Sequence, residues 1–127
     1  AGTDPVGPVA LDIPAQDRVL SLPRASQHVA CLTVGALLNE AVGAADFQAV
    51  AARFRALLLD DIVPFAVGDN NRAKRFMVLI DTLYEAGTRV YMRAAVAPKQ
   101  LYPASGTLAF EFARTVSRLQ EMRFKKS

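Results

Sequence analysis

The stretch that most constrains the fold lies between residues 70 and 98, NNRAKRFMVLIDTLYEAGTRVYMRAAVAP. Apolar residues recur in its first part at the spacing of one helical face: Phe76, Leu79, Ile80 and Leu83. Gly87 follows, where a left-handed residue commonly ends a helix. Residues 88–96 are then rich in apolar residues and stop before Pro98, which is typical of a buried strand. The stretch predicts a helix followed by a strand.

The preceding segment supplies the other half of a β-α-β unit. Residues 57–63, LLLDDIV, are continuously apolar except for two aspartates, which predicts a strand covered on both faces. A strand, a helix and a strand of these lengths favour a right-handed parallel crossover. Residues 108–123 predict a further helix packed on this core, because Phe112, Val116 and Leu119 share one side.

The N-terminal part is predicted to be simpler. Residues 18–22 and 28–34 read as two strands of a hairpin, and Asp46 is positioned to cap a helix that ends near Arg55. Pro5, Pro8 and Pro14 disfavour helix before residue 18. We therefore expect an α/β fold with residues 1–17 as a lead-in, partly of cloning origin, and residues 18–127 as a single domain.

Composition excludes several classes of protein. Apolar residues make up 52% of the chain and charged residues 21%, which is a globular composition. No apolar run approaches the ~20 residues that span a bilayer, and no secretory signal is visible at the N-terminus. The single cysteine, Cys31, fits a reducing compartment, so we expect a soluble, cytoplasmic protein. Basic residues do not interleave with aromatic ones, which disfavours nucleic acid as a partner.

Residue patterns for independent catalysis are mostly absent from the sequence. It contains no G-x-x-x-x-G-K-[ST] loop to hold nucleotide phosphates. His28 and Cys31 lie three apart on one expected strand, so their side chains point to opposite faces. We predict no catalytic residue and no metal site.

Charged side chains remain as candidate binding residues. Asp60 and Asp61 end an expected strand, where open α/β sheets bind ligands, although a solvated turn explains them at least as well. Arg114 and Arg118 lie four residues apart on one helical face and need acidic partners, either the local Glu111 and Glu121 or an external anion.

Four blocks of the sequence together resemble the C-terminal part of the ZapE-type ATPases, which are AAA-like P-loop enzymes. The blocks are GAADFQAVAARF, NNRAKRFMVLIDTLYEAGTRV, APKQLY and FEFARTVSRLQEM. Asn71, Arg75 and Asp81 match the second block, and Arg114 and Arg118 match the fourth. Asp81 is also a candidate partner for Arg75 or for a residue across an interface. The sequence departs from the family pattern at Arg72, Arg93, Phe47 and Glu85.

The resemblance implies that the chain is part of a longer ATPase that binds ATP and magnesium through a segment outside these residues. This chain would then need no cofactor of its own and would be inactive alone. It implies that Asn71, Arg75, Asp81, Arg114 and Arg118 face a nucleotide or an interface, with the rest of the ATPase chain, neighbouring subunits or a protein client as partners. An adaptor module that binds a client or a division-machinery partner is the alternative.

Overall fold

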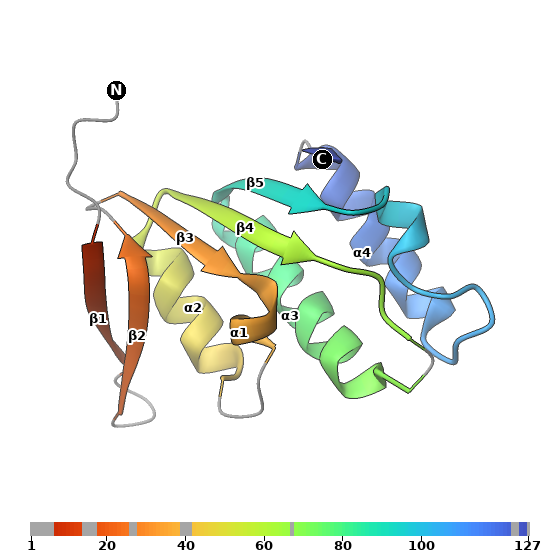
Figure 1. The fold of residues 1–127 in the computed structure, drawn as a ribbon, viewed down its shortest axis with the longest axis horizontal. Helices are drawn as coiled ribbons and strands as arrows, with labels where there is room; N and C mark the ends of the chain where they lie inside the picture. The colour runs from red at the N-terminus through yellow and green to blue at the C-terminus, as the bar shows by residue number, and fades with distance from the viewer. Residues whose placement is uncertain are drawn as a thin grey trace.

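The described strands form one mixed sheet with helices packed on it (Figure 1). The computed structural model of the chain describes residues 7–13, 18–25, 28–38, 42–66, 68–122 and 125–126. Its strands are β1 (Gly7–Ile13), β2 (Arg18–Ala25), β3 (Val29–Thr33), β4 (Ala56–Ile62), β5 (Arg89–Ala94) and β6 (Lys125–Lys126), in that spatial order. Its helices are α1 (Val34–Leu37), α2 (Ala44–Arg53), α3 (Asn70–Ala86), the 3₁₀ turn η2 (Pro98–Gln100) and α4 (Ala109–Glu121).

The parallel β-α-β core is confirmed. β4 pairs in parallel with β3 on one side and with β5 on the other, so the two strands expected around α3 are adjacent. β5 also pairs in parallel with the short β6. The fold is therefore α/β, with α2 and α3 as the crossover helices.

The N-terminal strands are antiparallel, and one of them was not expected. β2 pairs with β3 through Arg24 and Ala25, as the hairpin prediction requires, but it also pairs along most of its length with β1. Residues 7–13, which form β1, fall within the stretch assigned to the lead-in. An edge strand tolerates Pro8 because the proline need not donate to a neighbouring strand. The remaining lead-in residues, 1–6 and 14–17, lie outside the described part, as does Arg123.

Helix ends follow local chemistry with one correction. Asp46 is not the N-cap of α2: the cap is Gly43, and Asp46 lies in the first turn, where its Oδ1 accepts the Gly43 N–H at 3.0 Å. Gly87 ends α3 with φ 71°, the left-handed conformation that the sequence predicts.

Among the described residues, helices cover the parallel strands on one face only, so the expectation of two covered faces is wrong for this part of the chain. Along β5 the residues alternate between exposed and buried, and along β3 and β4 the side chains that alternate with the buried ones stay partly or fully exposed. The strands β3, β4 and β5 lie in front of α3 and α4 in Figure 1, and the core lies between these two layers. The sequence could not reveal this, because residues such as Leu58 and Tyr91 are apolar on the uncovered face as well.

An aromatic cluster positions α4 against α3. Phe112 of α4 stacks on Phe76 of α3 at 6.1 Å and on Tyr102 at 5.3 Å, measured between ring centroids. Phe65 closes the cluster at 5.5 Å from Phe76. These buried rings fix the distance between the two helices and so bring their charged outer residues together.

Candidate functional site

The charged candidates of α3 and α4 meet in one network, which we call the interhelix network (Asp81, Tyr84, Glu85, Arg114, Arg118 and Glu121). Asp81 accepts hydrogen bonds from Arg114 Nη2 and Arg118 Nη1, each at 2.7 Å. Arg118 also approaches Glu85 at 3.4 Å. One carboxylate thus holds two arginines, which offsets the repulsion expected between two cations four residues apart.

Arg114 and Arg118 differ in exposure. The side chain of Arg118 is 19% exposed, and its guanidinium carbon lies 4.5 Å from the centroid of the Tyr84 ring. The side chain of Arg114 is 67% exposed at the rim of the network. Arg118 is therefore held on three sides, whereas Arg114 presents most of its surface to solvent.

Tyr84 extends the network to the end of α4. Its hydroxyl donates a hydrogen bond to Glu121 Oε2 at 2.5 Å. That hydrogen bond, and next the negative charge of Glu121, raise the pKa of Tyr84 above its ordinary value of 10.0. Tyr84, Glu85 and Glu121 were not predicted as members of a site, although all three lie in the sequence blocks that carry the family resemblance.

The partners differ from those that local spacing suggested. The sequence suggested Glu111 and Glu121 as local partners for the two arginines, and Arg75 as a candidate partner for Asp81. Instead both arginines pair with Asp81, 33 and 37 residues away in sequence. The cause is tertiary: α3 and α4 pack side by side in the same direction, so residues about 37 apart face each other, as Tyr84 and Glu121 also do.

Asn71 and Arg75 lie outside the interhelix network. Both are on α3, Asn71 exposed and Arg75 partly buried, and neither makes an ion pair or a side-chain hydrogen bond among the described residues. The neighbouring Asn70 has the structural role: it accepts from the Tyr102 hydroxyl at 2.7 Å and donates to Thr107 at 2.8 Å. Asn70 thereby ties the start of α3 to the segment before α4.

Asp60 and Asp61 lie at the carboxyl end of β4, as expected. Asp60 Oδ1 accepts the Asp61 N–H at 2.8 Å, and its other oxygen lies 3.5 Å from Arg93 of β5. Asp61 has φ 61°, and the pairing of β4 with β5 shifts register at this point. Among the described residues no group of three or more His, Cys, Asp or Glu side chains could hold a metal ion. The hydrogen bond from the Asp61 N–H to Asp60 and the positive φ of Asp61 favour the turn interpretation of the aspartates.

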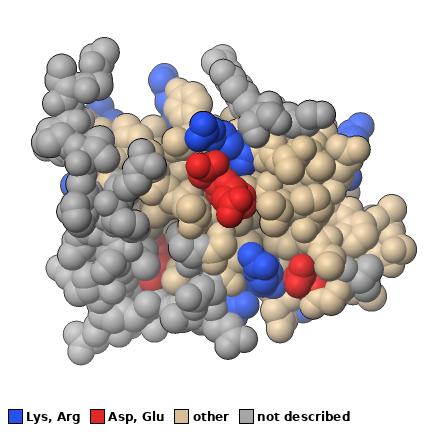
Figure 2. Space-filling model, in the orientation of Figure 1, with Lys and Arg blue, Asp and Glu red and all other residues tan. Residues whose placement is uncertain are grey.

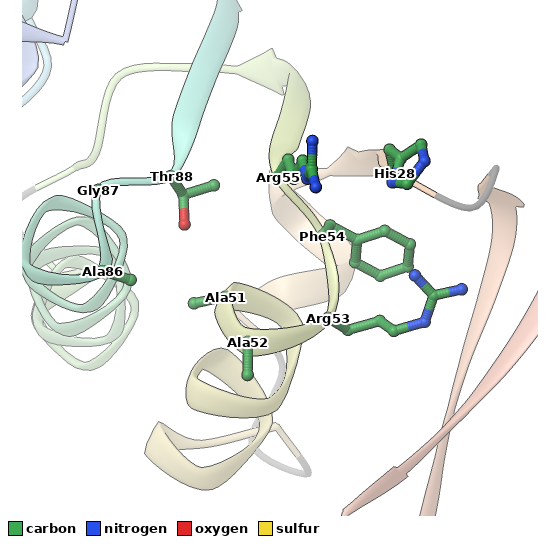
Figure 3. Close-up of a pocket in the computed structure, with 9 residues that line it drawn as sticks. All are labelled: His28, Ala51, Ala52, Arg53, Phe54, Arg55, Ala86, Gly87 and Thr88. Carbon is green, nitrogen blue, oxygen red and sulfur yellow. The ribbon is translucent and has the colours of Figure 1, made fainter.

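A cavity of about 540 Å³ lies at the opposite, amino-terminal edge of the parallel strands (Figure 3). His28, Arg55 and Thr88, which directly precede β3, β4 and β5, line it together with Arg53 and Gly87. Arg53 lies in the last turn of α2, and its guanidinium carbon is 4.8 Å from the centroid of the Phe54 ring. Basic residues at this edge complement the negative carbonyl ends of α2 and α3, which gives them a structural role. None of the sequence candidates lines this cavity.

Several of the charged candidates are engaged with one another within the described residues. The two arginines of α4 are already bound by carboxylates, and Asp60 is engaged by a backbone N–H and by Arg93. The Gly-rich loop that cradles phosphates has no counterpart in the sequence.

The parallel strands, their crossover helices and the charged helix pair define an α/β protein. A sequence model of the AFG1-like ATPase family matches residues 8–126. The chain belongs to this family.

Similar proteins span bacteria, a fungus and a fish. The chain is 33% identical over 78 residues to the cell division protein ZapE of Escherichia coli, covering 61% of this chain and 20% of that protein. It is 26% identical over 133 residues to an uncharacterized protein of Schizosaccharomyces pombe, covering 84% of this chain and 29% of that protein. It is 29% identical over 107 residues to lactation elevated protein 1 homolog B of Danio rerio, covering 84% and 21%. No solved structure matches the chain significantly.

Two further findings bear on the whole protein. The chain spans between 20% and 29% of the length of these relatives. No helix in the described part of the chain is both long and apolar enough to cross a membrane.

Proposed function

We propose that the chain is the C-terminal part of an AFG1-like ATPase whose remaining part binds ATP and magnesium and carries out hydrolysis. The observation that carries this proposal is a family match over residues 8–126 in a chain that has no phosphate-binding loop in its sequence. The α/β core would act as scaffold for the nucleotide-binding part, and the isolated chain would be inactive.

Nucleotide binding tests this proposal directly. We expect the isolated chain to bind no ATP in calorimetry, with or without magnesium, and the full-length protein to bind and hydrolyse it. Saturable ATP binding by the isolated chain would contradict the assignment of ATP binding to the remaining part of the protein. Absence of ATP hydrolysis by the full-length protein would contradict the family activity itself.

Arg114 is the residue of the interhelix network that we assign to function in the full-length enzyme. It is the more exposed arginine, and Asp81 retains Arg118 as a partner when Arg114 leaves. We propose that Arg114 contacts a neighbouring subunit or the nucleotide of the full-length enzyme, with the exposed Asn71 and the partly buried Arg75 of α3 as further interface candidates.

The test is Arg114→Ala in the full-length protein, with Lys74→Ala on exposed α3 surface as a control of equal charge. We expect Arg114→Ala to slow ATP turnover by at least about tenfold while the melting temperature changes little, because an arginine that stabilises phosphate acts on turnover. Wild-type turnover together with a lowered melting temperature would assign Arg114 to structure alone.

One observation favours the alternative, an adaptor module for a protein client. Phe110, in the first turn of α4, is 89% exposed, and large exposed aromatics are typical anchors of protein interfaces. The relative from Escherichia coli is named a cell division protein, so a partner in the division machinery is one client to consider. Client binding by the isolated chain that needs no nucleotide and is lost in Phe110→Ala would support this function over the scaffold.

We also propose a cytoplasmic location. Cys31 is the single cysteine of the sequence and lies partly exposed on β3, where a reducing compartment would keep its thiol free. Fractionation of cells that express the full-length protein tests this directly.

A further inference from the structure

The uncovered face of the parallel strands is apolar along its middle. Strand register aligns Cys31 of β3 with Leu58 of β4 and Leu58 with Tyr91 of β5, so these three side chains form one row across the sheet. Val29 and Ala56 form the neighbouring row. We call this surface the open sheet face (Val29, Cys31, Ala56, Leu58 and Tyr91). Tyr91 is 48% exposed on it.

Two arginines of β5 flank this apolar surface. Arg89 and Arg93 precede and follow Tyr91 by two residues, so all three side chains leave β5 on the same face. Arg93 is 3.5 Å from Asp60, whereas Arg89 has no ion-pair partner in the part of the chain that the structure describes. Figure 2, drawn in the orientation of Figure 1, shows uncharged surface broken by small groups of charge on this side of the molecule.

The topology explains why the chain leaves this face open. From β3 to β4 to β5 each parallel strand is added on the same side of the previous one. Crossovers of the same hand then place α2 and α3 on one face of the sheet, and none of the described helices packs on the other. Parallel sheets occur almost only with both faces covered, because their strands are rich in apolar residues on both sides.

We propose that a helical layer from the part of the full-length family protein outside this chain packs on the open sheet face. This rests on the proposed function, in which the chain belongs to a longer ATPase, and on the fact that it spans only 20% to 29% of its relatives. The chemistry of the face defines the layer: an apolar stripe against the row of Cys31, Leu58 and Tyr91, with carboxylates opposite Arg89 and Arg93. The two parts of the enzyme would thus be joined through this sheet.

Cys31 reports on the interface, since it is the single cysteine of the chain and belongs to the open sheet face. The probe is alkylation by iodoacetamide, followed at the peptide that contains Cys31 by mass spectrometry. We expect Cys31 to react in the isolated chain and to react at least about tenfold more slowly in the full-length protein, where reaction requires local opening. Equal rates in both would overturn the proposal.

Two variants of the full-length protein sharpen the test. Tyr91→Asp places a carboxylate in the apolar row, and Val78→Asp is the matched control on α3, where Val78 is 43% exposed on the other side of the molecule. We expect Tyr91→Asp to restore alkylation of Cys31 and Val78→Asp to leave it protected. Equal effects of the two variants would count against a specific interface. Arg89→Glu, at an exposed position that leaves the core intact, should increase alkylation as well if Tyr91→Asp does not fold.

The remaining outcomes separate this inference from the proposed function. A second copy of the chain is the competing occupant: Cys31 protected in the isolated chain, with a dimer mass by light scattering, would overturn the proposal. Protection of Cys31 in a full-length protein that does not hydrolyse ATP would support the interface while the ATPase proposal fails. An active ATPase in which Cys31 reacts freely would support the ATPase proposal while the interface proposal fails.

Discussion

At the scale of single residues, two positions in the described part of the chain have left-handed backbone conformations, for different reasons. Gly87 has φ 71° at the end of α3, where the chain must turn directly into β5. Asp61 has φ 61° where β4 shifts register against β5, and aspartate is among the few side chains that adopt this region readily. Gly87 was predictable because helix ends have a local signature, whereas Asp61 was not, because a register shift depends on the neighbouring strand.

Gly87→Val should destabilise the protein by about 1–2 kcal/mol or somewhat more, because a β-branched residue is strained at positive φ. An added Cβ meets nothing within 4 Å at Gly87, so the cost is one of backbone conformation and not of collision. Gly35→Ala, within α1 and equally unobstructed, is the control and should be neutral or slightly stabilising. Chemical denaturation of wild type, Gly87→Val and Gly35→Ala measures the free energy of unfolding. If Gly87→Val leaves it unchanged, position 87 is not strained by a side chain.

Tyr84→Phe should reveal a pH-dependent contribution to stability. Because Glu121 raises the pKa of Tyr84, the folded state binds the phenolic proton more tightly than the unfolded state does. The contribution is therefore complete below the ordinary pKa of 10.0 and is lost as the pH rises through the raised value. Melting temperatures recorded between about pH 8 and pH 11 should show wild type above Tyr84→Phe at the lower end and a narrowing gap at the upper end. A gap that stays constant with pH would contradict the hydrogen bond.

At the scale of elements, the pairing of α3 with α4 decides what the charged residues can do. Buried rings hold the helices together, and the interhelix network runs along the outside of the same contact. Asp81 is central, since it contacts both arginines while its side chain is only 30% exposed. A shared, partly buried carboxylate is expected to contribute more than an isolated surface ion pair.

Asp81→Asn should lower the free energy of unfolding by about 1 kcal/mol, because it preserves the shape of the side chain but removes the charge that both arginines share. Glu85→Gln is the matched control: its single contact is longer, at 3.4 Å, and its side chain is 71% exposed. It should cost a few tenths of a kcal/mol at most. Urea denaturation at low and high salt measures both, and the effect of Asp81→Asn should shrink as salt screens the pairs. Equal effects of the two variants would remove Asp81 from the centre of the network.

At the scale of the whole molecule, the described residues around the parallel strands form two layers, a sheet and one set of helices. Leu58 and Leu59 are neighbours on β4, yet Leu59 is fully buried against the helices whereas Leu58 belongs to the open sheet face. The period of two in a strand separates them onto opposite faces.

Leu59→Ala should therefore cost about 2–5 kcal/mol in the isolated chain, as expected for a cavity in a packed core. Leu58→Ala should cost well under half as much, because the lost side chain is partly solvated. Denaturant midpoints of the two variants measure the difference. Similar losses at both positions would mean that the isolated chain covers both faces of its sheet.

The sequence by itself determined the elements that depend on neighbours along the chain: the apolar face and glycine end of α3, the strands on either side of it, and their parallel order. Apolar periodicity and helix-ending residues are local signals, so they can be recognised without knowing the tertiary structure. The pairing of Asp81 with Arg114 and Arg118, and of Asp60 with Arg93, was decided only in the tertiary structure, because such partners are distant in sequence and meet only when helices and strands are placed. The single covered face was also decided by the tertiary structure. An apolar residue in a strand does not reveal by itself whether helices of this chain cover its face of the sheet or leave it exposed.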